Sequence, residues 1–224
     1  QIKMTRNSEP FSKVLQANGR FGFEEKEQQT SALLTCLRFP KKLLSGSIWI
    51  DGLNLSSVDE NDLRARIGLI SNHSYISFLS VRENLDPNDA FDDSEIWEVL
   101  DIVGLSSQVA SLKEGLLTKF SNIDPEMFWT GEIILFSFAR VLLNKNKLIC
   151  VDHIRLQEDI EYKVIDLIHV EFQESLLLIA SENRNFLDAC CSSIFQINTI
   201  ATDEELNTKE PYKAFNLFEN LHFN

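Results

Sequence analysis

Two neighbouring residues, Asp152 and His153, carry groups that acid–base or metal chemistry uses. They directly follow the apolar run 148–151, so they should lie at the end of a buried strand. A carboxylate there could hold Mg²⁺, and the imidazole could act as a base because it titrates near neutral pH. We favour the simpler interpretation, in which Asp152 caps a helix or is solvated. His153 could also form a metal site with His169, but the two share no ligand spacing, so we expect surface histidines.

The elements that would position these groups follow the pattern of an α/β domain, because short apolar runs alternate with helical patterns. Two runs, 148–151 and 176–179, are apolar at every position, as expected for parallel strands covered on both faces. The predicted strands are 47–50, 67–70, 148–151, 176–179 and 194–197.

Helices are predicted between these strands. Asp92 and Glu95 have the spacing of a capping box, and Gly104 is suited to end the helix that follows. The segment 131–144 is apolar on nearly every side, so it should form a buried helix. Two further helical stripes are Ile96, Leu100 and Val103, and Ile160, Val164, Leu167, Ile168 and Phe172.

We interpret 1–224 as a single domain with a helical insertion at about 80–125 and a helical tail at about 205–224. The tail carries Tyr212, Phe215 and Phe218. It could be an amphipathic binding helix, but a helix docked on the domain's own core is the simpler interpretation.

Composition narrows the classes of protein. A net charge of -13 opposes binding to nucleic acid or to an anionic membrane surface. No apolar run approaches the roughly 20 residues that span a bilayer. The four cysteines show neither zinc spacing nor a disulfide framework, which favours a cytosolic domain. The N-terminal stretch lacks a signal-peptide core and an initiator Met, so we expect an excised piece or an incomplete gene.

Several passages resemble one family. They are SGSIWIDGLNLSSVDENDLRARIGLI (45–70), SFLSVRENLDP (77–87), DDSEIWEVLDIVGL (92–105), FSFARVLLNKNKLICVD (136–152) and VEFQESLLLIASENRNFLDAC (170–190). Their order and spacing are similar to nucleotide-binding domains of ABC transporters of the multidrug-resistance (C-subfamily) type. The V-R-E-N-L-D-P string is most like the second such domain. The resemblance covers about residues 40 to 200 and implies a P-loop NTPase-like fold with a reduced N-terminal β-subdomain.

The resemblance also locates the phosphate cradle, whose pattern is G-x-x-x-x-G-K-[ST]. The segment in that place begins at Gly22, which could be a remnant of the glycines. Gln29 or Gln28 falls where the lysine belongs, and Thr30 and Ser31 remain as possible hydroxyls. We therefore expect the cradle to be lost.

Three glutamates, Glu24, Glu25 and Glu27, lie where an anionic ligand would sit, and their charges would repel it. They are most simply a solvated first helical turn, where carboxylates suit the helix dipole. Lys26 could substitute for the lost lysine, but side chains now fill the space that glycines keep clear.

Four other ATP positions implied by the resemblance are replaced as well: Asn72 stands for the Q-loop glutamine, Trp129 for the signature serine, His153 for the catalytic glutamate and Ser181 for the H-loop histidine. Two positions keep the family's residue, Gly131 of the signature motif and Asp152, the Walker B aspartate. Trp129 with Phe128 could make a new partner contact or pack locally, and both interpretations stay open. Because each loss removes a separate contribution to catalysis, we expect no ATP hydrolysis and no cofactor, with ATP and Mg²⁺ bound weakly at most.

We therefore predict a pseudo-ATPase domain that forms the structural or regulatory half of a transporter's cytosolic dimer. The resemblance implies two partners, another nucleotide-binding domain and the transporter's coupling helices, and a place at the cytoplasmic face of a membrane. Two alternatives are a half-site that binds ATP but hydrolyses it weakly, and a free-standing interaction protein derived from such a transporter.

Overall fold

The computed structural model describes residues 2–3, 18–24, 34, 37–42, 48–50, 53–72, 76–124, 130–196 and 216–217. The chain divides into two compact units. Unit 1 comprises Gln1–Gly68, Lys147–His153 and Glu174–Asn224, and unit 2 comprises Leu69–Asn146 and Ile154–Gln173. Each unit is described by itself.

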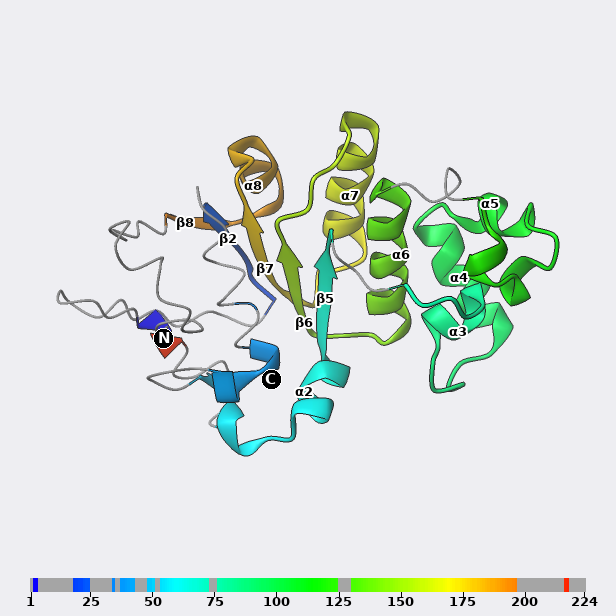
Figure 1. Cartoon of the computed structure of the whole chain (residues 1–224). Helices are drawn as coiled ribbons and strands as arrows, with labels where there is room; N and C mark the ends of the chain where they lie inside the picture. The colour runs from blue at the N-terminus through cyan, green and yellow to red at the C-terminus, as the bar shows by residue number, and fades with distance from the viewer. Residues whose placement is uncertain are drawn as a thin grey trace, which may run out of the picture. The chain divides into compact units, whose positions relative to one another are not determined.

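The main sheet has the strand order β5-β6-β7-β2-β8. Its strands are β5 (Ile67–Ser71), β6 (Leu148–Asp152), β7 (Leu176–Ser181), β2 (Arg20–Glu24) and β8 (Ser193–Gln196). The pairs β6–β7, β7–β2 and β2–β8 are parallel, and Figure 1 shows β6, β7 and β2 side by side. Every residue of β7 is buried, as the uniformly apolar run predicts. The α/β prediction is confirmed.

Strand β2 corrects the prediction for the segment around Glu24. The sequence predicts that Glu24 lies in the first turn of a helix, whereas in the structure it is the last residue of a strand between β7 and β8. The alternation of RFGFE gives the physical reason, because Phe21 and Phe23 both contact Phe195 of β8: Phe21 stacks on its ring, and the buried Phe23 meets it at a tilt.

One helix covers this part of the sheet. Helix α8 (Arg184–Cys190) packs on β2 and β7 with Phe186, Leu187 and Cys190 buried. The rest of unit 1 contains η1 (Pro40–Lys42), the hairpin of β3 (Trp49–Ile50) and β4 (Leu53–Asn54), η2 (Leu55–Ser57) and α2 (Glu60–Arg66).

The predicted C-terminal helical tail falls almost wholly outside the described residues, including Tyr212, Phe215 and Phe218. Its two described residues, Asn216 and Leu217, form strand β9, which pairs antiparallel with β1 (Ile2–Lys3). For these two residues the helix prediction is wrong, because backbone pairing with a distant strand replaces the local helical pattern.

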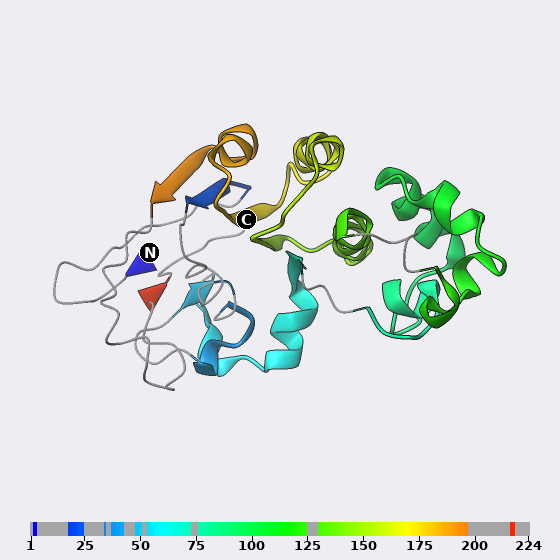
Figure 2. The same cartoon turned by 45° about the horizontal axis from the view of Figure 1, so that its top comes forward.

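Unit 2 is mainly helical. Its elements are α3 (Val81–Leu85), α4 (Asp93–Ile102), α5 (Ser106–Ala110), η3 (Gly115–Leu117), η4 (Phe120–Asn122), α6 (Thr130–Leu143) and α7 (Glu158–Val170). Helix α6 packs on α3 and α4, and α4 also packs on α5; Figure 2 shows the green helices of the segment 81–122 gathered together. These helices occupy the segment where an insertion is predicted.

Local signals at the helix ends are confirmed. Asp92 and Glu95 form the capping box of α4. Gly104 has φ +67°, the left-handed conformation of a helix-terminating glycine. A second capping box, Ser80 with Glu83 at the start of α3, escaped the sequence analysis although its S-x-x-E spacing was visible.

Candidate functional site

Three parallel strands of unit 1 end with polar residues. Because β6, β7 and β2 run in the same direction, their carboxyl ends meet at one edge of the sheet, where ligands bind in open α/β sheets. Asp152 is opposite Ala180, and Glu24 is opposite Ser181. The structure therefore brings together three positions that the sequence analysis singles out, Asp152, His153 and Ser181, and adds Glu24 to them.

His153 is not the surface histidine that the sequence predicts, because its side chain is only 14% exposed. Its backbone N–H donates to the Ala180 carbonyl at 2.9 Å, so the ladder between the strands continues one residue beyond Asp152. The residue has φ +45°, a left-handed conformation that is uncommon for residues other than glycine. Nδ1 lies 3.8 Å from Oδ1 of Asp152. His169, on α7 of unit 2, is exposed as predicted.

Ser181 serves the turn between β7 and α8. It is buried, and its Oγ accepts a hydrogen bond from the N–H of Asn183 at 3.0 Å. The Asn183 side chain in turn accepts from the N–H of Phe186 and caps α8. The hydroxyl at the position of the family's H-loop histidine is thus engaged in local structure.

Glu24 forms an ion pair that the sequence analysis missed. Its Oε2 lies 2.8 Å from NH1 of Arg184, the first residue of α8. The same guanidinium donates from Nε to the Asp188 carboxylate at 3.1 Å. Hydrogen bonds to Asp188 and then to Glu24 raise the pKa of Arg184. The carboxyl end of β2 is therefore occupied by a carboxylate that already has an internal cationic partner.

Gly22 lies within β2, two residues before the strand ends. A Cβ at this position would lie 3.1 Å from each of three side-chain atoms: Cys191 Sγ, Ile194 Cγ1 and Leu187 Cδ2. The lack of a side chain is thus used by the packing of α8 and β8 against the strand.

Two further positions lie in unit 2. The Oδ1 atom of Asn72, directly after β5, accepts a hydrogen bond from the backbone N–H of Arg155 at 2.9 Å. Gly131, in the first turn of α6, would place a Cβ 3.1 Å from Cγ1 of Ile160. Asn72 holds the segment that follows His153, and Gly131 makes room for the start of α7.

The remaining predicted positions, Gln29, Thr30, Ser31 and Trp129, lie outside the described residues. Within the described ranges, no group of three or more His, Cys, Asp or Glu side chains could hold a metal ion. None of the helices in that part of the chain has the length and apolarity that a membrane crossing needs.

No family model matches the chain, but individual proteins do. It is 30% identical over 159 residues to the ABC transporter gloK of Glarea lozoyensis, covering 70% of this chain and 12% of that protein. It is 33% identical over 131 residues to the human ATP-binding cassette sub-family C member 2, covering 58% of this chain and 8% of that protein. It is 29% identical over 209 residues to ABC transporter C family member 14 of Dictyostelium discoideum, covering 89% of this chain and 16% of that protein. The chain thus spans less than a fifth of the length of these curated relatives.

Proposed function

Because the chain belongs to the C family of ABC transporters and corresponds to a nucleotide-binding domain, we propose that it is a catalytically inactive form of that domain. It would act as a structural or regulatory half of a transporter's cytosolic dimer, at the cytoplasmic face of a membrane. The observation that carries the proposal is the engagement of Glu24 with Arg184 at the end of β2.

The electrostatics at this edge oppose a nucleotide. Phosphate cradles work because backbone N–H groups and a lysine face the anion. Here the strand that leads to the cradle ends with a carboxylate, and the nearby Arg184 already binds that carboxylate and Asp188. An incoming phosphate would meet like charge from Glu24 and would compete for a cation that is already in use.

The groups that would position Mg²⁺ and water are likewise engaged within the protein. Oγ of Ser181 accepts from Asn183, and Oδ1 of Asn72 accepts from Arg155. His153 replaces the carboxylate expected of the catalytic base with a largely buried ring. Since phosphoryl transfer depends on positioning and charge stabilisation, these replacements together support the absence of hydrolysis.

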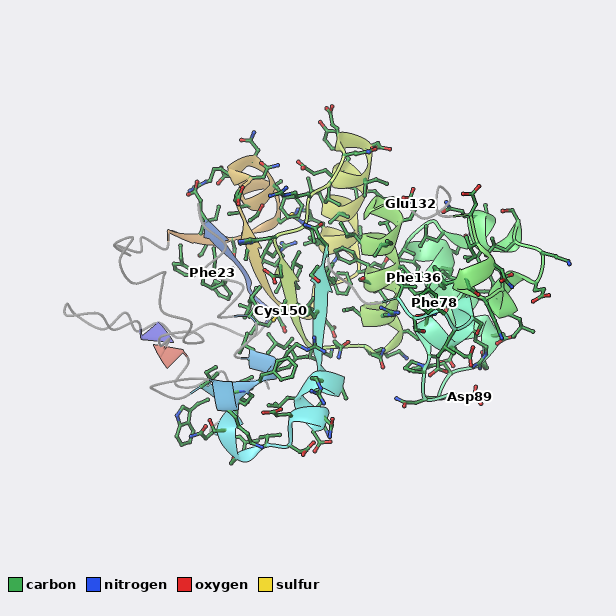
Figure 3. The ribbon with its side chains drawn as sticks, viewed as in Figure 1. Phe23, Phe78, Asp89, Glu132, Phe136 and Cys150 are labelled. Atoms are coloured by element: carbon green, nitrogen blue, oxygen red, sulfur yellow. The ribbon has the colours of Figure 1, made fainter. Side chains whose placement is uncertain are left out.

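We further propose that unit 2 contacts the coupling helices of a transmembrane part. Three apolar side chains, Phe78, Leu79 and Leu117, are 81%, 49% and 65% exposed, respectively. Their segments lie beside each other. Ser80 and Lys119 form an antiparallel β-bridge, and the Leu79 carbonyl accepts a hydrogen bond from the N–H of Phe120. Figure 3 labels Phe78 among the helices of unit 2. An exposed apolar patch of this kind suits a protein interface.

The retained Asp152 favours a second candidate, a half-site that binds ATP and hydrolyses it weakly. Equilibrium calorimetry with Mg-ATP on the purified chain decides between the two. We expect no detectable binding by the native chain or by Gln29→Lys. Micromolar binding by the native chain that is lost in Asp152→Asn would establish the half-site instead. Glu24→Gln, with Glu174→Gln as a charge-matched control at an exposed ion pair with Lys147, then tests whether the Glu24 charge contributes to the exclusion of ATP.

A further inference from the structure

Two arginines of unit 1, Arg38 and Arg64, lie close together without a carboxylate partner among the residues that the structure describes. Arg38 is half-buried, directly after Leu37, and its Nε is fully buried with no hydrogen-bond partner. Burial lowers its pKa, the nearby Cys150 thiol opposes this shift, and the charge of Arg64 adds to it. A buried guanidinium is normally paired, because an unpaired charge in the interior is costly.

Arg64 does not neutralise this charge but doubles it. Its guanidinium carbon lies 5.2 Å from the centroid of the Phe39 ring, the residue next to Arg38. This cation–π contact fixes the direction of the side chain. The hydrogen bond that Arg64 makes on its own helix goes to a neutral amide, Oδ1 of Asn61.

The charged groups on the neighbouring elements leave the pair uncompensated. Helix α2 also carries Glu60 and Asp62 in its first turn. Glu60 is partly buried and Asp62 is exposed, and neither forms an ion pair with Arg38 or Arg64. Asp59 caps α2 by accepting from the N–H of Asn61, and Lys41 on η1 adds another positive charge near Asp59. Among the residues that the structure describes, neither guanidinium group therefore has a carboxylate partner, although the chain has a net charge of -13.

We propose that Arg38 and Arg64 form a binding site for the phosphate group of a small molecule, separate from the positions that the family uses for ATP. A phosphate dianion matches two positive charges, and its tetrahedral oxygens accept from guanidinium forks. Phe39 would hold Arg64 in place, so little side-chain freedom is lost on binding. A carboxylate carries one charge and would neutralise half of the pair.

The test is calorimetric titration of the full chain at low ionic strength with inorganic phosphate, AMP and acetate. Arg64→Gln is the main variant, because Arg64 is exposed on α2 and its loss leaves the core intact. Arg155→Gln is the matched control, since it removes one exposed arginine from unit 2. We expect one saturable site for phosphate, binding weakened about tenfold or more by Arg64→Gln, no change with Arg155→Gln, and much weaker acetate binding. Tighter binding of AMP than of phosphate would identify a nucleotide or similar monoester as the source of the phosphate group, and equal binding would identify free phosphate.

Absence of saturable phosphate binding, or equal binding by native chain and Arg64→Gln, would overturn the inference. Mg-ATP measured on the same variants keeps this outcome separate from the proposed function. ATP binding that disappears in Arg64→Gln belongs to the arginine pair and leaves the inactive cradle as proposed. ATP binding that survives in Arg64→Gln would contradict the proposed function, while the phosphate titration still decides the arginine site.

Discussion

Replacement of Asn84 by alanine should destabilise unit 2 more than any surface substitution in its helices. The side chain is buried in α3 and bonded on every side. Its Oδ1 accepts from N–H and Oγ of Ser77 at 2.8 and 3.0 Å. Its Nδ2 donates to the carbonyls of Ser77, Leu79 and Ser80 at 3.1, 3.2 and 2.9 Å. One amide therefore fixes the whole loop that precedes α3.

The expected cost follows from these bonds. Each net hydrogen bond contributes about 1 kcal/mol, and a buried group left without a partner costs about 1–3 kcal/mol. The N–H and the carbonyl of Ser77 would each lose their bond to the Asn84 side chain, so we expect Asn84→Ala to lower the free energy of unfolding by about 3–5 kcal/mol. Arg140 adds to this dependence, because its NH2 group donates to Oδ1 of Asn84 at 3.4 Å. Burial of this guanidinium lowers the pKa of Arg140 to about 10.

Urea unfolding followed by far-UV circular dichroism measures the effect. Asn88→Ala is the control, since Asn88 is exposed in the same segment. If the two variants differ by less than about 1 kcal/mol, the loop before α3 is not held by Asn84 and the reasoning from its hydrogen bonds fails.

Three further predictions concern other parts of the chain. Gly22→Ala should cost about 1–3 kcal/mol of stability in the same unfolding assay, because the new Cβ meets three side chains at 3.1 Å. The Cys150 thiol should stay unreactive toward a thiol reagent up to pH 9 until the chain unfolds, since burial raises its pKa to about 12. Burial by itself raises the pKa of Asp86. Hydrogen bonds from the backbone N–H groups of Ala90 and Phe91, together with the charge of Arg82, outweigh this effect, so the pKa of Asp86 is lowered overall. The stability that Asp86 contributes should therefore be present above its ordinary pKa near 4 and be lost as the pH falls through the lower native value, so that the difference from Asp86→Asn disappears in acid.

The parts of the fold that sequence reasoning predicts are those that local chemistry decides. The runs at β6 and β7 are apolar at every position, and a strand covered on both faces is the simplest structure that buries them. The capping box of α4 is a contact between residues three apart, so its spacing alone is informative. Strand β2 escaped prediction because RFGFE is short and mixed, and only pairing with β7 and β8 makes it a strand.

At the candidate site, sequence reasoning predicts residue types but not what those residues contact. That a glutamine, a histidine and a serine stand where the family has a lysine, a glutamate and a histidine is visible in the chain itself. The ion pair of Glu24 with Arg184 joins residues 160 positions apart, and no local sequence pattern predicts such a contact. The left-handed backbone of His153 likewise depends on the neighbouring strand.

The two glycines that survive at ATP positions also have a role that only their contacts in the structure reveal. Gly22 and Gly131 each lie where a Cβ would press on a neighbouring element, Gly22 on Cys191 and its neighbours and Gly131 on Ile160. The fold requires small residues at both places whether or not a nucleotide binds. Gln29, by contrast, stands at a position whose lysine serves only the phosphate in the family's cradle. A domain kept for its structure alone would therefore retain these glycines and lose that lysine, which is the pattern this sequence has.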